Sequence, residues 1–319
     1  MIFGKVLVLV LTFYFLYTTV FTAPDTLLTW QSILDKAWNS DNMYLLMLTI
    51  LLIPLNWGFE AAKWHLLGNK IEHMSFYRAY RSVMVGLTLG FITPNRIGDY
   101  AGRVLELKSN ERLDAIGAIF IGRFCQLVAT VLAGSLGLLY FILHFYAAEY
   151  PAITLSLLVV LLALCAALLL LLFNARAMVA MVAAIKPLKK FVHYVAIMAS
   201  YNRQEIWRLL VLSMGRYLVF MLQFILLLIF FDVDLTAIEY LSGVSGTFFL
   251  KSVVPSVTLL SDLGVRELSA MYLFGLLGQN KLYVLSASLT LWLLNIAVPS
   301  AVGIYFVLRL RFTKKGKTT

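Results

Sequence analysis

The sequence predicts an all-α, multi-pass membrane protein, folded as a helical bundle with two inverted structural repeats that each contain a Pro-broken re-entrant hairpin. The 319 residues are 61% hydrophobic and only 13% charged, and long apolar runs recur along the chain, as in helices that cross a bilayer. A short polar phrase occurs twice inside apolar sequence, about half the chain apart. Broken apolar segments at matching positions in two halves are typical of inverted-repeat transporters.

Six apolar runs are long enough to cross the membrane. They cover residues 6–22, 43–62, 113–143, 152–173, 209–231 and 282–308. We interpret the run at 6–22 as an uncleaved first helix rather than a signal peptide. No polar stretch is long enough to fold separately, so residues 1–319 are predicted to form one transmembrane domain, with repeat halves at about 43–173 and 205–310.

The net charge of +10 indicates a membrane orientation rather than a nucleic-acid partner. With the N-terminus inside, most Lys and Arg residues fall in segments predicted to be cytoplasmic. The predicted outer segments hold only Lys36 and Lys281, among several acids. This is the positive-inside pattern, and a basic surface also attracts anionic lipid. We therefore expect a protein of the cell inner membrane with both termini in the cytoplasm.

Two further apolar regions, residues 82–107 and 238–279, contain the repeated polar phrases. The charge pattern requires the first region to enter and leave from the cytoplasm, and the second from outside. Two hairpins from opposite faces are the product of an inverted repeat. In the alternative, each region crosses once as a long tilted helix, which places basic and acidic loops on the wrong sides.

The two phrases share a proline, a short turn, and then Asp and Arg four residues apart. They read Pro94-Asn95-Arg96-Ile97-Gly98-Asp99-Tyr100-Ala101-Gly102-Arg103 and Pro255-Ser256-Val257-Thr258-Leu259-Leu260-Ser261-Asp262-Leu263-Gly264-Val265-Arg266-Glu267. Structural breaks are predicted at Pro94, Gly98, Pro255 and Gly264. Ionisable side chains at membrane depth cost roughly 2.5–3.5 kcal/mol each, so they point to function.

The first phrase has the chemistry of an anion site. Asn95 is suited to cap a second half-helix, on which Arg96, Asp99 and Arg103 share one face. Asp99 and Arg103 form an acid-before-base pair, and Arg96 adds a planar donor fork near a positively polarised helix N-terminus. In the alternative interpretation, Asp99 and Arg103 only neutralise each other inside the hairpin.

The second phrase is closer to neutral. Asp262 and Arg266 are spaced as a pair, Glu267 is adjacent, and Lys251 lies on the incoming arm. This copy therefore fits a gate, or a contact for a headgroup amine, as well as an anion site.

Other polar residues interrupt the apolar helices. Arg123 and Arg216 have no local partner, so each is expected to face the bundle interior, toward a lipid phosphate or a hairpin acid. Asn56, Glu60 and Lys63 recur on one helix face near a predicted cytoplasmic end. The simplest interpretation is that Glu60 and Lys63 reach the membrane interface.

The chain resembles a known family, the lysylphosphatidylglycerol synthase transmembrane region, also called the flippase-like domain family. The resemblance rests on four segments in order: Lys63-Trp64-His65-Leu66-Leu67, the phrase from Thr93 to Arg103, Gly122-Arg123-Phe124, and Leu263-Gly264-Val265-Arg266-Glu267. Two departures are visible: Asp99 stands where the family usually has Glu, and Ser261-Asp262 stand where a Gly-rich turn is common.

The resemblance implies a lipid translocase for a phospholipid or lipid-linked molecule with a modified or charged headgroup. Two-domain members also carry a soluble aminoacyl-transferase domain, which this sequence lacks, so lipid aminoacylation by this chain alone is not expected. The predicted substrate-binding residues are Arg96, Asp99, Arg103, Arg123, Arg216, Lys251, Asp262, Arg266 and Glu267, with arginines on phosphate and acids on headgroup amines or hydroxyls.

No cofactor, catalytic motif or nucleotide-binding motif is predicted. The expected partners are membrane lipids with a phosphate-containing headgroup. Two alternatives stay open: an integral-membrane enzyme on lipid-linked substrates, with Asp99 as acid or base, and a non-transporting partner of a lipid-synthesising enzyme. Homo-oligomer formation also stays open.

Overall fold

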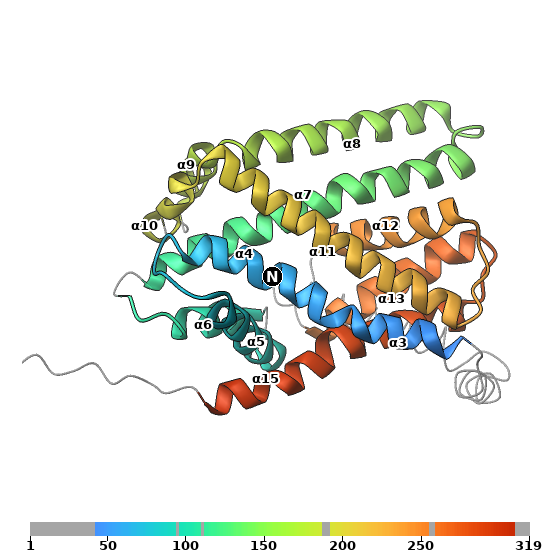
Figure 1. Ribbon diagram of the computed structural model, residues 1–319. Coiled ribbons are helices and arrows are strands. Elements are labelled where there is room, and N and C mark those ends of the chain that lie inside the picture. Colours follow the sequence, from blue (N-terminus) through green and yellow to red (C-terminus); the bar gives the residue numbers. More distant parts are fainter. Residues whose placement is uncertain (1–41, 94–95, 110–111, 187–191, 255–258, 310–319) are drawn as a thin grey trace, which may run out of the picture.

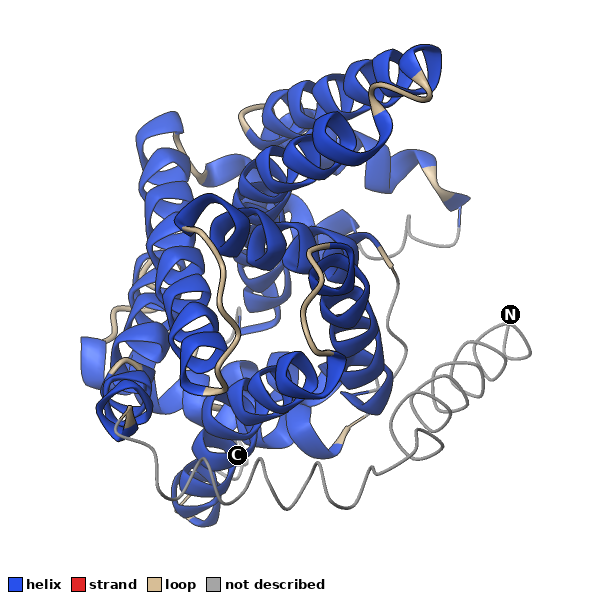
Figure 2. Ribbon diagram, turned by 90° about the vertical axis from the view of Figure 1, so that its right-hand side faces the viewer, coloured by secondary structure: helices blue, strands red, loops and turns tan. Residues whose placement is uncertain are grey.

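The computed structural model describes residues 42–93, 96–109, 112–186, 192–254 and 259–309, where every regular element is a helix and none is a strand (Figures 1 and 2). The helices are α3 (Met43–Leu51), α4 (Ile53–Gly68), α5 (Phe76–Ile92), α6 (Ile97–Leu105), α7 (Ala115–Phe141), α8 (Pro151–Leu172), α9 (Ala175–Ala184), α10 (Val192–Val195), α11 (Arg203–Phe230), α12 (Ala237–Val253), α13 (Leu259–Leu276), α14 (Lys281–Trp292) and α15 (Val298–Leu308). The predicted all-α class is confirmed.

Five helical stretches in the described ranges are long and apolar enough to cross a membrane. They are Met43–Gly68, Arg112–Tyr146, Pro151–Leu172, Arg203–Phe230 and Lys281–Leu308, and each overlaps a predicted span. The predicted span at residues 6–22 lies outside the described residues. Helix α8 buries only Thr154 and Leu172 and is apolar all round, so its surface suits contact with lipid (Figure 1).

The two regions that carry the polar phrases each form a pair of packed helices, α5 with α6 and α12 with α13. Helix α5 also packs on α15, where the Thr88 hydroxyl donates to the Ser300 carbonyl at 2.8 Å. Helix α12 packs along α7. Helices α5 and α12 end at Ile92 and Val253, shortly before Pro94 and Pro255, which lie outside the described residues. A proline disfavours helical backbone in the residue before it.

Gly98 and Gly264 are not helix breaks, contrary to prediction. Gly98 is the second residue of α6, and Gly264 lies within α13. A Cβ added to Gly98 would collide with the Leu89 carbonyl oxygen of α5. The small residue at 98 is therefore required for close helix packing, not for a change in backbone direction.

The two ends of each helix pair are joined by hydrogen bonds. Before α5, the Glu72 carboxylate accepts from the backbone N–H groups of Lys108 and Ser109, which follow α6, at 2.6 and 2.9 Å. The second pair has a similar link, since the Gln279 amide after α13 donates to the Asp234 carbonyl before α12 at 3.0 Å. In each pair, the residues that precede the first helix therefore lie beside the residues that follow the second helix.

Glu72 makes the link at the first pair dependent on pH. Burial raises the pKa of this carboxyl, but hydrogen bonds from Arg78, Lys108 and Ser109 outweigh burial and hold the pKa below its ordinary value. Because the folded pKa is depressed, the stabilisation is present above the unfolded pKa of about 4.3 and is lost as the pH falls through the folded pKa.

We predict that Glu72→Gln lowers the free energy of unfolding by about 1 kcal/mol at pH 7, since these are charge-assisted but partly solvated bonds. The difference from the wild type should shrink as the pH falls through the folded pKa of Glu72, which lies below the unfolded value of about 4.3. Thermal unfolding of both proteins in detergent across this pH range is the measurement, and a difference that stays constant with pH would contradict the assignment.

The apolar core has two main clusters of buried residues. One surrounds Trp64 and includes Trp57 and Leu87. The other surrounds Phe224 and includes Tyr217 and Phe248. These side chains hold α4, α5, α11 and α12 around the polar site.

Candidate functional site

A cavity of about 350 Å³ is lined by residues of both core clusters and by a dense set of charges. Among the described residues, seven basic and two acidic side chains line it. They are Lys63, Arg96, Arg103, Arg123, Arg216, Lys251 and Arg266, with Glu60 and Asp99. The cavity thus brings together seven of the predicted binding residues, from α6, α7, α11, α12, α13 and the segment before α6.

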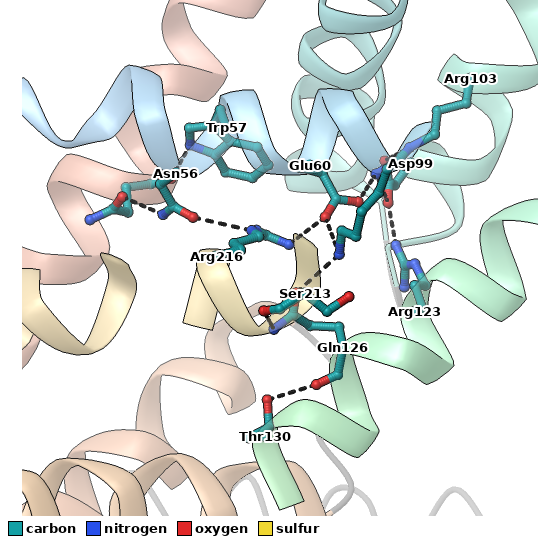
Figure 3. A network of polar contacts seen from close by, with 12 residues as sticks. Asn56, Trp57, Glu60, Asp99, Arg103, Arg123, Gln126, Thr130, Ser213 and Arg216 are labelled. Atoms are coloured by element: carbon teal, nitrogen blue, oxygen red, sulfur yellow. Dashed lines mark hydrogen bonds and ion pairs between the residues drawn. The ribbon is translucent and has the colours of Figure 1, made fainter. Parts of the chain in front are cut away.

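Glu60 on α4 is the hub of the charge network (Figure 3). Its Oε1 accepts from Arg103 of α6 at 2.9 Å, and its Oε2 accepts from Arg216 of α11 at 2.7 Å. The Lys63 ammonium, one turn along α4, lies 2.8 Å from the same Oε2. One carboxylate therefore joins three helices and three cations.

The interpretation that Glu60 and Lys63 reach the membrane interface is wrong. Their exposed fractions are only 6% and 2%, and the Lys63 ammonium also donates to Gln126 Oε1 at 3.0 Å. Glu60 and Lys63 were therefore not predicted as site residues. The available signal was their spacing with Asn56, which places all three on one face of α4.

Asp99 on α6 holds two arginines. Its Oδ1 accepts from Arg103 Nε at 3.0 Å, which confirms the predicted pair. Its Oδ2 pairs with Arg123 of α7. Of the two kinds of partner predicted for Arg123, a lipid phosphate or a hairpin acid, the structure shows the hairpin acid. A Cβ at Gly86 of α5 would collide with Asp99 Oδ1, so the glycine leaves room for the carboxylate. Arg216 differs, because its acid partner is Glu60 and not a hairpin residue.

Aromatic rings support three of the guanidinium groups. Arg123 lies over Tyr100 at 4.6 Å, Arg216 over Trp57 at 5.0 Å, and Arg103 over Trp64 at 5.7 Å from the ring centroid. Trp64 lies one residue after Lys63, in the segment that resembles the family motif. A cation over an aromatic face is attracted by the ring quadrupole and tolerates partial loss of water.

A polar chain extends the network to the last span. Asn56 Oδ1 accepts from Arg216 at 3.1 Å, and Asn56 Nδ2 donates to Asn295 Oδ1 at 2.8 Å. Asn295 lies in a π-helical turn, Leu293–Ala297, whose backbone carbonyl at Asn295 accepts from Trp57. Such turns within α-helices are frequent at functional sites. Neither Asn56 nor Asn295 was predicted as a site residue.

Arg96 stands immediately before α6, not in its first turn as expected. Its backbone is left-handed, with φ 53° and ψ 31°, a conformation that costs a non-glycine residue of order 1–3 kcal/mol and clusters at functional sites. The Thr93 hydroxyl accepts from the Gly98 N–H at 2.8 Å and so caps the start of α6. The predicted cap, Asn95, lies outside the described residues.

In the second phrase, Arg266 pairs with its neighbour Glu267. Arg266 donates to Glu267 Oε1 at 2.5 Å and to the Ser288 carbonyl at 3.0 Å, and both Arg266 and Glu267 are buried. The side chain of Asp262, its predicted partner, lies outside the described part of the structure. Arg266 and Lys251 line the cavity, whereas Glu267 is outside the described lining and pairs with Arg266.

The fold and site define a helical, multi-pass membrane protein with a cationic cavity inside its bundle. Among protein families, the profile described as Lysylphosphatidylglycerol synthase TM region matches residues 2–303, and the chain belongs to this family. Neither the curated proteins nor the solved structures gave a match.

Proposed function

We propose that this protein is a lipid translocase of the inner membrane that takes a phosphate-containing lipid headgroup into its cationic cavity. The observation that carries this proposal is the concentration of seven basic side chains around one cavity in a bundle of apolar helices. Charges at membrane depth are expensive and mark substrate paths, and arginine suits phosphate because its planar fork donates two hydrogen bonds at once. The tails would stay in the bilayer during movement.

The proposal includes two re-entrant hairpins, α5/α6 and α12/α13, that enter from opposite faces as an inverted repeat. One finding supports this arrangement: hydrogen bonds join the two ends of each pair. If neither pair crosses the membrane, the five consecutive apolar stretches cross it in alternate directions. Most basic residues outside the spans then fall on the cytoplasmic side, together with both termini.

Cysteine accessibility tests this topology. Ser75 and Ser109 flank the first hairpin and should both react with membrane-impermeant reagent only from the cytoplasm, because the ends of a re-entrant segment share one face. Thr236 and Asn280 flank the second hairpin and should both react only from outside.

The labelling background lacks Cys125 and Cys165, which are free thiols. If the two positions that flank either hairpin react from opposite faces, that segment crosses the membrane and the re-entrant proposal fails for it.

Transport itself is tested with purified protein in liposomes that contain fluorescent phosphatidylglycerol. The expected result is lipid movement between leaflets without chemical change. Formation of a new lipid product would instead favour the membrane enzyme, with Asp99 as acid or base. If neither occurs, the result favours the alternative that the protein is a non-transporting partner of a lipid-synthesising enzyme. Co-purification from membranes would then identify that enzyme.

A further inference from the structure

Among its described lining residues, the cavity has more positive than negative charge. The described lining has seven basic and two acidic side chains. If Glu267 and Asp262 are counted as well, four acids still face seven bases. Buried charges require compensation by opposite charge or by hydrogen bonds. A ligand that brings net negative charge would supply it.

The two acids of the lining are already engaged. Glu60 uses both oxygens for Arg103, Arg216 and Lys63, and Asp99 uses both oxygens for Arg103 and Arg123. An ammonium group of a ligand would have to share a carboxylate that is already held by two or three cations of the protein. The expectation that Asp99 contacts a headgroup amine is therefore not supported by its surroundings.

Among the described residues that line the cavity, Asn295 has a buried donor without an acceptor. Asn295 is 1% exposed, and its Nδ2 has no hydrogen-bond partner among the described residues, although its Oδ1 accepts from Asn56. Buried polar groups are nearly always paired. An anionic oxygen brought within reach would accept from this N–H group, whereas an ammonium would not.

We propose that the cavity selects lipids whose headgroup carries a net negative charge and rejects lipids whose headgroup carries a net positive charge, such as an aminoacylated phosphatidylglycerol. This inference rests on the proposed function, because it names the substrate class of the same cavity. Selection comes from attraction to the excess cations and from repulsion of a further cation.

The test measures lipid binding to the purified full chain in detergent, with phosphatidylglycerol, phosphatidylethanolamine and lysylphosphatidylglycerol as probes. Phosphatidylglycerol should bind about 10-fold more tightly than lysylphosphatidylglycerol, and phosphatidylethanolamine should fall between them. Equal or tighter binding of lysylphosphatidylglycerol would overturn the proposal. Free glycerol phosphate at the same concentration should not displace phosphatidylglycerol; efficient displacement would assign the cavity to soluble anions instead.

A charge series separates the cavity from general attraction to a basic surface. Lys251→Gln and Lys251→Glu change the cavity charge by one and two, so they should reduce the preference for phosphatidylglycerol over lysylphosphatidylglycerol by about 3-fold and about 10-fold. The matched changes at exposed Lys281, outside the lining, should leave the preference unaltered. Equal effects at both positions would overturn the cavity assignment. If Lys251→Glu does not fold, the lipid preference of Lys251→Gln, compared with that of Lys281→Gln, tests the cavity assignment.

Binding and transport can fail separately. Selective binding without lipid movement would contradict the proposed translocase function but support the proposed charge selection. Movement of all three lipids at equal rates would support the proposed translocase function but contradict the proposed charge selection.

Discussion

Replacing Glu60 by glutamine is expected to lower the free energy of unfolding by about 3–5 kcal/mol, the usual cost of removing one partner from a buried ion network. The substitution hardly changes side-chain volume, but it leaves Lys63, Arg103 and Arg216 around a neutral amide. Arg103 keeps Asp99, whereas no other acid pairs with Arg216 in the described contacts. The measurement is thermal unfolding of the purified variant, together with its folded yield.

A second substitution shows whether the loss of stability in Glu60→Gln comes from unbalanced charge or from local distortion. The double variant Glu60→Gln with Lys63→Gln removes one uncompensated cation, so it should recover part of the lost stability. Glu149→Gln in an exposed turn is the control for loss of a carboxylate. If Glu60→Gln unfolds at the same temperature as Glu149→Gln, the network does not stabilise the fold.

The spans were predictable because a bilayer imposes simple rules on sequence. A helix must satisfy its own backbone and present apolar side chains over its full length. Consequently the runs predicted at 113–143 and 152–173 match Arg112–Tyr146 and Pro151–Leu172 closely. The run at 43–62 ended too early because Glu60 and Lys63 were interpreted as interfacial, whereas α4 continues to Gly68.

The site was only partly predictable. Arg123, Arg216 and the acid–base pair Asp99–Arg103 stand out because charge is rare within apolar runs. The assignment of Glu60 to Arg216 depends on which helices become neighbours, and the two residues lie more than 150 positions apart. The π-helical turn at Asn295 leaves no comparable signal in the residues around it. Polar contacts between distant helices are a property of the tertiary fold.

Replacing Gly102 by alanine is expected to destabilise the protein by about 2 kcal/mol or more, through overpacking between two helices. A Cβ at Gly102 of α6 would lie 2.6 Å from the Cα and 2.7 Å from the N of Gly86 in α5. These are backbone atoms, so no rotamer change relieves the contact. Helices α5 and α6 would have to separate, which would also move Asp99 and Arg103 away from Glu60. The variant should therefore lose lipid binding as well as thermal stability.

Gly58→Ala is the matched control, because Gly58 also lies within a helix but has no atom within 4 Å of an added Cβ. Alanine there should leave the unfolding temperature unchanged or raise it, since alanine favours helical backbone by up to about 1 kcal/mol over glycine. Equal unfolding temperatures for the two variants would mean that α5 and α6 accommodate a methyl group without cost. The close contact would then not determine where the hairpin holds its charged residues, and the position of Asp99 would have to depend on its ion pairs alone.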